Sequence, residues 1–166
     1  MTAAAQPPSG SVASRLAGLG LVLPDVAAPV AAYVPAVRTG NLVWTSGQLP
    51  FVAGSLPVTG KVGDGAGLVP PDDAKALART AALNALAAVA QVTGSLDRVV
   101  RVVKVVGFVA SDPSFTGQPG VVNGASELLG EVFGEAGQHA RSAVGVPVLP
   151  LDSPVEIELV VEVAAG

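Results

Sequence analysis

The segment Pro154-Val155-Glu156-Ile157-Glu158-Leu159-Val160-Val161-Glu162-Val163 decides the fold, because apolar and acidic residues alternate along most of it. Successive side chains of a β-strand point to opposite faces, so one face is expected in a hydrophobic core. The other face, which carries three glutamates, is expected to meet water or a cleft. Another strand is predicted shortly before it, over Ala140-Arg141-Ser142-Ala143-Val144-Gly145-Val146.

The sequence in the middle of the chain predicts a strand between two helices. β-branched residues dominate Val99 to Val109, which is typical of a central strand covered on both faces. Pro71 to Val92 predicts a helix, since Pro71 suits a first turn and Gly94 suits a left-handed cap. A second helix is predicted over Val121 to Phe133.

The first half adds a hairpin, with strands predicted over Val34 to Arg38 and Leu42 to Thr45. Pro50 to Pro70 is rich in glycine and proline and is expected to be a loop with at most one short strand. Its glycines lack a phosphate-binding pattern, so no cofactor is expected. The element order predicts an α+β fold in which two helices pack on one side of a mixed β-sheet.

The chain of 166 residues is expected to hold one main domain, at residues 29–166. Residues 1–28 are expected to be an N-terminal extension with a short helix near residues 11–19. Met1 to Gly10 contains no basic residue and no apolar run, so a signal peptide is not expected. A cytoplasmic location is therefore expected.

Composition excludes several classes of function. Cysteine is absent and His139 is the only histidine, so neither a metal site nor a cysteine nucleophile is expected. The longest uncharged stretch is broken by glycines and prolines, which argues against a membrane-spanning helix. The net charge of −4 argues against a nucleic-acid partner.

Arg141 is the main candidate for ligand binding, because an arginine fork can hold a carboxylate by two parallel hydrogen bonds. Ala143 and Gly145 would lie beside it on the same face of a strand and leave room for a ligand. The ordinary alternative is a surface arginine paired with a nearby glutamate.

The other candidates also have ordinary alternatives. Glu156 could be a solvated strand residue, and Ser46 a turn hydroxyl that no histidine activates, since His139 lacks a triad signature. Tyr33 could be a half-buried core residue, and Asn123 could cap the second helix.

Together, these residues lie in segments that resemble the Rid (YjgF-like) family. The resemblance covers roughly residues 29 to 163 and is carried by Tyr33-Val34-Pro35-Ala36-Val37, Gly40-Asn41-Leu42-Val43-Trp44-Thr45-Ser46-Gly47-Gln48-Leu49-Pro50, Val122-Asn123, Ala140-Arg141-Ser142-Ala143-Val144 and Val155-Glu156-Ile157-Glu158. It implies a chorismate-mutase-like α+β fold, assembled as a homotrimer with ligand sites between subunits.

The resemblance further implies a cofactor-free enamine/imine deaminase. Such an enzyme hydrolyses 2-imino acids or enamines, such as 2-aminoacrylate, to 2-keto acids and ammonia, and so clears reactive products of pyridoxal-dependent and amino-acid-oxidising enzymes. By position, Arg141 would bind the substrate carboxylate. Glu156 would lie near the attacking water, and Tyr33 would be the second catalytic residue. Ser46, Gly47 and Asn123 would line the same cleft and bind substrate.

This chain also departs from the family pattern. Many active members have a cysteine where it has Ala143 and an acidic residue where it has Gly145. Residues 111–120 are also longer than in typical deaminases, which suggests a divergent subgroup. Two alternatives therefore stay open: a non-catalytic trimer that binds keto acids or related metabolites as a sensor or regulator, and the ribonuclease or translation-inhibiting activity attributed to relatives.

Overall fold

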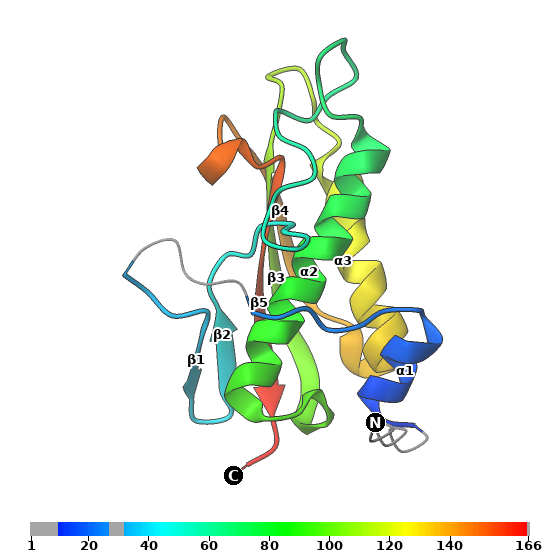
Figure 1. Ribbon diagram of the computed structural model, residues 1–166, viewed down its shortest axis with the longest axis vertical. Coiled ribbons are helices and arrows are strands. Elements are labelled where there is room, and N and C mark those ends of the chain that lie inside the picture. The colour runs from blue at the N-terminus through cyan, green and yellow to red at the C-terminus, as the bar shows by residue number, and fades with distance from the viewer. Residues whose placement is uncertain (1–9, 27–31, 166) are drawn as a thin grey trace.

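The computed structural model describes residues 10–26 and 32–165 of the chain. Figure 1 shows two long helices lying side by side against a sheet, with a short helix beside their lower ends. The elements are, in order, α1 Val12–Gly18, β1 Ala36–Thr39, β2 Leu42–Thr45, α2 Pro71–Thr93, the 3₁₀ helix η1 Leu96–Arg98, β3 Val99–Ala110, α3 Gln118–Phe133, η2 Gly134–Gly137, β4 Ala140–Val146, η3 Pro150–Asp152 and β5 Val155–Val163.

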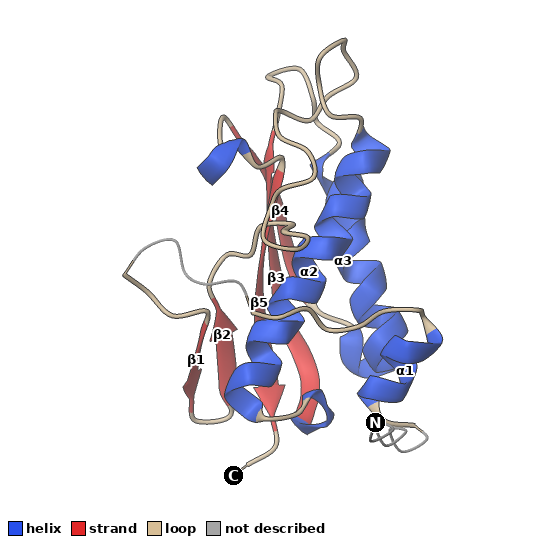
Figure 2. Ribbon diagram, in the orientation of Figure 1, coloured by secondary structure: helices blue, strands red, loops and turns tan. Residues whose placement is uncertain are grey.

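The sheet has the strand order β1-β2-β5-β3-β4. Strand β4 runs parallel to β3, and the other neighbouring pairs are antiparallel. A parallel pair needs a crossover connection, and α3 supplies it. Both long helices lie on one side of the sheet (Figure 2). The predicted α+β fold with a mixed sheet covered on one side by two helices is therefore confirmed.

Small residues let the two long helices approach each other and the sheet. Ala81, Ala85 and Ala88 of α2 are fully buried in the same core as Leu128 of α3. Gly124 of α3 lies so close to the backbone carbonyl of Lys75 that a β-carbon there would overlap it. The alanine-rich pattern thus gives close packing, and a side chain at position 124 would push the helices apart.

The boundaries of α3 and β1 differ from those predicted. Helix α3 begins at Gln118 rather than Val121, so Asn123 lies inside the helix and does not cap it. The segment before Val121 contains Gly117 and Pro119 and resembles a loop in sequence. Proline nevertheless fits a first helical turn, where its missing N–H would have no partner. Strand β1 begins at Ala36, two residues later than predicted.

The expectation that β3 is covered on both faces holds for one face only. Val102, Val105 and Val109 are fully buried beneath the helices. On the opposite face Val103 is exposed, as is Trp44 of β2, whose exposed fraction is 51%. Within the described ranges, this second face is an open one that carries apolar residues.

Helix α1 joins the main core. Val12 and Leu16 are buried in it, and the Arg15 guanidinium donates to the carbonyl of Val132 at 2.9 Å. The backbone N–H of Val12 donates to Asp97 at 2.7 Å. The expected domain boundary after residue 28 lies outside the described residues.

The loop from residue 50 to residue 70 contains only isolated bridges, from Val52 to Ser55 and from Val62 to Val69 and to Ser111. The Asn84 amide ties its first residues to α2 through hydrogen bonds to the carbonyls of Leu49 and Phe51.

Candidate functional site

The six residues predicted for the site fall into two groups. The glutamate cluster consists of Tyr33, Ser46, Gly47 and Glu156, which lie around the β1–β2 end of the sheet and the start of β5. The arginine cluster consists of Asn123 and Arg141, together with Ser126 and His139, which the sequence analysis did not assign to the site.

In the glutamate cluster, Glu156 lies directly over the backbone of Gly47. A β-carbon at position 47 would overlap the end of the flexible Glu156 side chain, so a larger residue there would displace the carboxyl group. Paired backbone hydrogen bonds between Gln48 and Ile157, at 2.8 and 3.0 Å, hold the two segments together. This close approach fixes where the carboxyl group can lie.

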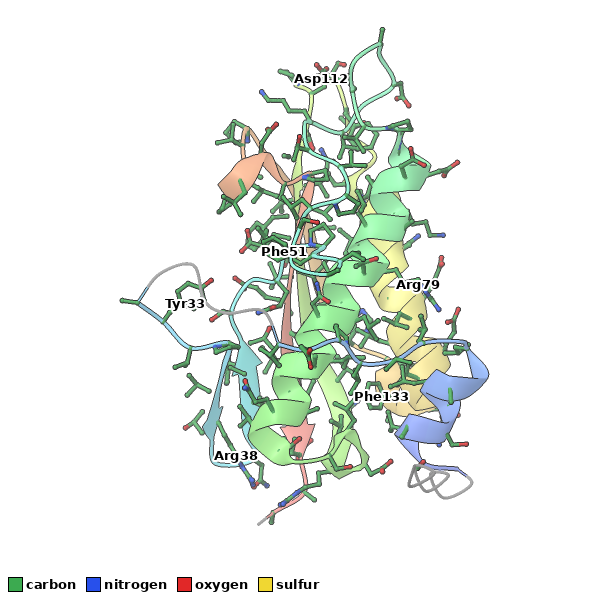
Figure 3. All side chains as sticks on the ribbon, in the orientation of Figure 1. Tyr33, Arg38, Phe51, Arg79, Asp112 and Phe133 are labelled. Atoms are coloured by element: carbon green, nitrogen blue, oxygen red, sulfur yellow. The ribbon has the colours of Figure 1, made fainter. Side chains whose placement is uncertain are left out.

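Ser46 and Tyr33 complete this cluster at its outer side. The Ser46 hydroxyl donates to the carbonyl of Val34 at 2.6 Å, and its N–H donates to the carbonyl of Pro35 at 2.8 Å. These bonds tie Ser46 to the segment that follows Tyr33. Tyr33 itself is 44% exposed, on the loop outside the β1 edge of the sheet (Figure 3), so it is not the half-buried core residue of the ordinary alternative.

The electrostatic environment of Glu156 favours the neutral carboxyl group. Partial burial raises its pKa, and the nearby negative charge of Glu158 raises it further. Burial also raises the pKa of Glu158. Both side chains lie on the open face, because they alternate with buried residues of β5 such as Ile157. The alternation predicted for this strand is confirmed.

In the arginine cluster, the Arg141 guanidinium is held by neutral oxygens of α3. Its Nη1 donates to Asn123 Oδ1 at 2.7 Å and to Ser126 Oγ at 3.2 Å, and its Nη2 donates to the carbonyl of Pro119 at 3.3 Å. The ion pairs among the described residues are Lys75–Glu127 and Arg79–Glu131. Arg141 is in neither, so the alternative of a glutamate-paired surface arginine is not found there.

His139 contacts Ser126, its neighbour in the arginine cluster. Its Nε2 lies 2.9 Å from Ser126 Oγ, and its Nδ1 lies 2.6 Å from the carbonyl oxygen of Gly137. A signal for this cluster was present in the sequence. Asn123 and Ser126 are three residues apart on one helix, and His139 and Arg141 are two apart beside one strand, spacings that place each pair on a common face.

The two clusters lie on opposite faces of the sheet. Arg141 contacts α3 and is therefore on the helix-covered side, at the edge strand β4, whereas Glu156 points to the open side. Their strands are two positions apart in the sheet, about 10 Å at the usual spacing. Tyr33 precedes β1, at the edge opposite β4. One chain thus brings Glu156 against Gly47 and Arg141 against Asn123 and Ser126, but it keeps the two clusters apart.

The positions where this chain departs from the family pattern lie along β4 beside Arg141. Ala143 packs against the core. A β-carbon at Gly145 would come within 2.7 Å of the Gln118 amide nitrogen, which bonds Ser111 and the carbonyl of Phe115. Gln118 therefore occupies the space that a larger residue at position 145 would need.

Within residues 10–26 and 32–165, no three His, Cys, Asp or Glu side chains gather closely enough to hold a metal ion. None of the described helices has both the length and the apolar content needed to cross a bilayer.

This α+β domain matches a known protein family over most of its length. A family model described as "YjgF/chorismate_mutase-like, putative endoribonuclease" matches residues 13–163. The chain therefore belongs to the YjgF/chorismate-mutase-like family, which confirms the resemblance to Rid proteins.

Individual relatives agree with this assignment. Protein TCP17 from Trypanosoma cruzi is 45% identical over 155 residues, which are 93% of this chain and 95% of that protein. A solved structure of unknown function from Agrobacterium tumefaciens is 44% identical, with a TM-score of 0.83 and 92% of each chain covered. Another, from Shewanella oneidensis, bears the same endoribonuclease description. It is 37% identical, with a TM-score of 0.88, and the match covers 93% of this chain and all of that one.

Proposed function

We propose that the protein hydrolyses 2-imino acids and their enamine tautomers to 2-keto acids and ammonia, without a cofactor. The observation that carries this proposal is the guanidinium of Arg141. It is held in place by neutral oxygens of α3, and it has no carboxylate partner among the described residues. A fixed, uncompensated cation at the edge of a sheet is suited to bind a small anion.

The unused hydrogen-bond donors of Arg141 match a carboxylate. Nη1 is occupied by Asn123 and Ser126, and Nη2 makes one bond to Pro119. The Nε–H and the second Nη2–H have no partner among the described residues. An Nε–H and an Nη2–H can lie in parallel along one edge of a guanidinium, and such a pair is suited to bind both oxygens of a substrate carboxylate.

Glu156 is suited to orient and deprotonate water. Its raised pKa makes the carboxylate a stronger base than an ordinary glutamate. Water would add to the imine carbon, and its first proton would pass through Glu156 to the nitrogen, which gives a carbinolamine. The carbinolamine hydroxyl would then give its proton through Glu156 to the same nitrogen as the C–N bond breaks, so that ammonia leaves and the keto acid remains. Imine and water thus give keto acid and ammonia, with no oxidant or metal required. Tyr33 and the Ser46–Gly47 backbone would line the cleft on the same side.

The proposal includes a homotrimer, because one chain keeps the two clusters apart. The open face carries a row of paired residues across three strands, Val37, Trp44 and Val160, next to Lys104. Val37 and Trp44 are about half exposed, whereas Val160 is buried. Exposed apolar residues such as the first two are typical of a face that another subunit covers. A second copy packed there would bring its arginine cluster toward the glutamate cluster of the first. The cytoplasmic location expected from the sequence is part of the same proposal.

The test is ammonia release from 2-imino acids generated freshly in the assay. The wild-type protein is expected to accelerate release above the rate in buffer, and Arg141→Ala is expected to abolish that acceleration. Arg79→Ala is the matched control, since Arg79 lies on the outer surface of α2 (Figure 3) and pairs with Glu131. No acceleration by wild type, or full acceleration by Arg141→Ala, would defeat the proposal.

Two further measurements, of pyruvate binding and of RNA cleavage, separate the alternatives. Saturable binding of pyruvate without turnover would select a non-catalytic metabolite binder. RNA cleavage at physiological salt would select the endoribonuclease activity in the family description. The chain's net charge of −4 opposes that activity, since RNA binding draws on clustered basic residues.

A further inference from the structure

A continuous line of contacts runs from Gly137 through His139 and Ser126 to Arg141. It ends at the guanidinium that is proposed to bind the substrate carboxylate. The carbonyl of Gly137 contacts His139 Nδ1, His139 Nε2 contacts Ser126 Oγ, and Ser126 Oγ contacts Arg141 Nη1. The distances along this line are 2.6, 2.9 and 3.2 Å. Ser126 and His139 are only partly accessible to solvent.

When His139 is neutral, the chemistry of the end groups sets the direction of every proton in this line. A backbone carbonyl can only accept, so His139 Nδ1 carries the proton that bonds Gly137. In a neutral imidazole, Nε2 is then an acceptor and receives the Ser126 hydroxyl proton. Because a guanidinium can only donate, Ser126 Oγ receives a proton from Arg141 Nη1. The histidine therefore turns the serine oxygen's lone pairs toward the arginine.

We propose that Ser126 and His139 are positioning residues that hold the Arg141 guanidinium in one orientation for its carboxylate ligand. This inference rests on the proposed function, because the ligand of Arg141 is the substrate carboxylate. Asn123 bonds the same nitrogen, Nη1. With Nη1 held twice, the guanidinium cannot turn freely, and its Nε–H has no partner among the described residues.

The hydrogen-bond partners of Ser126 support a role beyond helix packing. A serine inside a helix commonly bonds a backbone carbonyl of the preceding turn. Ser126 instead bonds side chains that come from outside α3. Without His139 the hydroxyl could rotate and turn its proton toward the guanidinium, which would remove an acceptor from Arg141. His139 thus acts on Arg141 only through Ser126.

The experiment is a titration of each full-length variant with pyruvate, which has the carboxylate of the product class. Ser126→Ala is expected to raise the dissociation constant about three- to tenfold, the effect of losing one typical intramolecular hydrogen bond. Ser126→Thr keeps the hydroxyl and is expected to bind as wild type does. Ser114→Ala removes a serine hydroxyl that bonds Asp112 instead, and it serves as the control.

A double-mutant cycle tests whether His139 acts through Ser126. His139→Leu is expected to weaken pyruvate binding as Ser126→Ala does, and the double variant is expected to be no weaker than either single one. His139→Gln places an amide oxygen near the Nε2 position and is expected to restore most of the affinity. Additive losses, or an unchanged dissociation constant in Ser126→Ala, would overturn the inference.

A second readout does not depend on any ligand. Nitrogen NMR of the free protein is expected to show His139 protonated at Nδ1 and not at Nε2, and to show slow rotation of the Arg141 guanidinium that becomes faster in Ser126→Ala. If wild type neither binds pyruvate nor hydrolyses imines but shows these signals, the proposed function fails and the positioning role stands. An Nε2-protonated tautomer, or unchanged rotation in Ser126→Ala, would refute the positioning role whatever the ligand.

Discussion

The two faces of the sheet carry similar apolar residues at very different exposures. On the helix-covered face, Val105 and Ile157 are fully buried. On the open face, Val37 is 54% exposed and its cross-strand neighbour Trp44 nearly as much. The covered face is closed within one chain by α2 and α3, whereas the described residues leave the other uncovered.

This difference also separates the two halves of the candidate site. The arginine cluster belongs to the covered side and is fixed by contacts with α3, while the glutamate cluster belongs to the open side. A chain folded alone can therefore prepare each half but not join them. We therefore propose that another copy of the chain covers the open face and that the site is completed there.

The largest effect is expected from a charge on the open face. Trp44→Glu would place a carboxylate in the middle of the apolar row, where burial against another subunit would be unfavourable. We expect this variant to be monomeric by analytical ultracentrifugation, and inactive.

The control for this change is Val22→Glu, at a more exposed position, 83% exposed, that lies outside the sheet. It is expected to assemble as wild type does. A Trp44→Glu variant that keeps the wild-type assembly would show that the open face is not an interface.

The next effect concerns the covered face. Leu128 of α3 is fully buried, so Leu128→Ala is expected to lower the free energy of unfolding by about 2–5 kcal/mol, measured by urea denaturation at fixed protein concentration. Leu151→Ala, at a 58% exposed position, is expected to change it by less than about 0.5 kcal/mol. Equal effects of the two changes would contradict the assignment of the core.

These elements show how far the sequence alone could lead. The alternation in Val155–Val163 predicted the last strand, and Pro71 and Gly94 predicted the two ends of α2. These predictions succeeded because each feature follows from local backbone geometry. The start of α3 was missed because its first turn contains glycine and proline, which also occur in loops. The β-branched run of β3 correctly indicated a strand, but residue type does not reveal whether a face is covered by the same chain or by another.

The site was less accessible to sequence reasoning. Arg141, Asn123 and Glu156 could be named from motif positions, but their separation on two faces depends on strand order and on the parallel pairing of β4. The contact of His139 with Ser126 was missed because the two residues are 13 positions apart, and only the docking of α3 against β4 joins them. The catalytic roles of Tyr33 and Glu156 stay predictions.

A smaller effect is expected from Arg141→Lys. Lysine keeps the positive charge but has no parallel pair of donors, so the geometry of the arginine cluster would be lost while its charge remains. The dissociation constant for pyruvate is expected to rise about tenfold, which corresponds to about 1.4 kcal/mol. Unchanged affinity would mean that charge alone binds the ligand and that the fork is not used.

The smallest effect is expected from Glu156→Gln, measured as stability against pH. Because the pKa of Glu156 is raised in the folded state, its ionisation at neutral pH costs stability that a neutral amide would not. The variant should therefore be more stable than wild type at neutral pH, by less than about 1 kcal/mol once solvent screening is allowed for.

This gain should disappear as pH falls below the ordinary range of glutamate, where the carboxyl group is neutral in both the folded and unfolded states. Glu158→Gln should show the same sign, since burial raises the pKa of that group too. A loss of stability at neutral pH, or a gain that does not vary with pH, would show that Glu156 has a stabilising partner.

The most direct test of the account is to mix two inactive variants. Arg141→Ala retains the glutamate cluster, and Glu156→Ala retains the arginine cluster. If the two clusters meet across subunits, unfolding the variants together and refolding them should restore imine hydrolysis at about a quarter of the sites, the share expected for random assembly of a cyclic oligomer. Refolding each variant alone should restore nothing. If the mixed sample is as inactive as its components while wild type recovers full activity, the two halves of the site belong to one chain and the account is wrong.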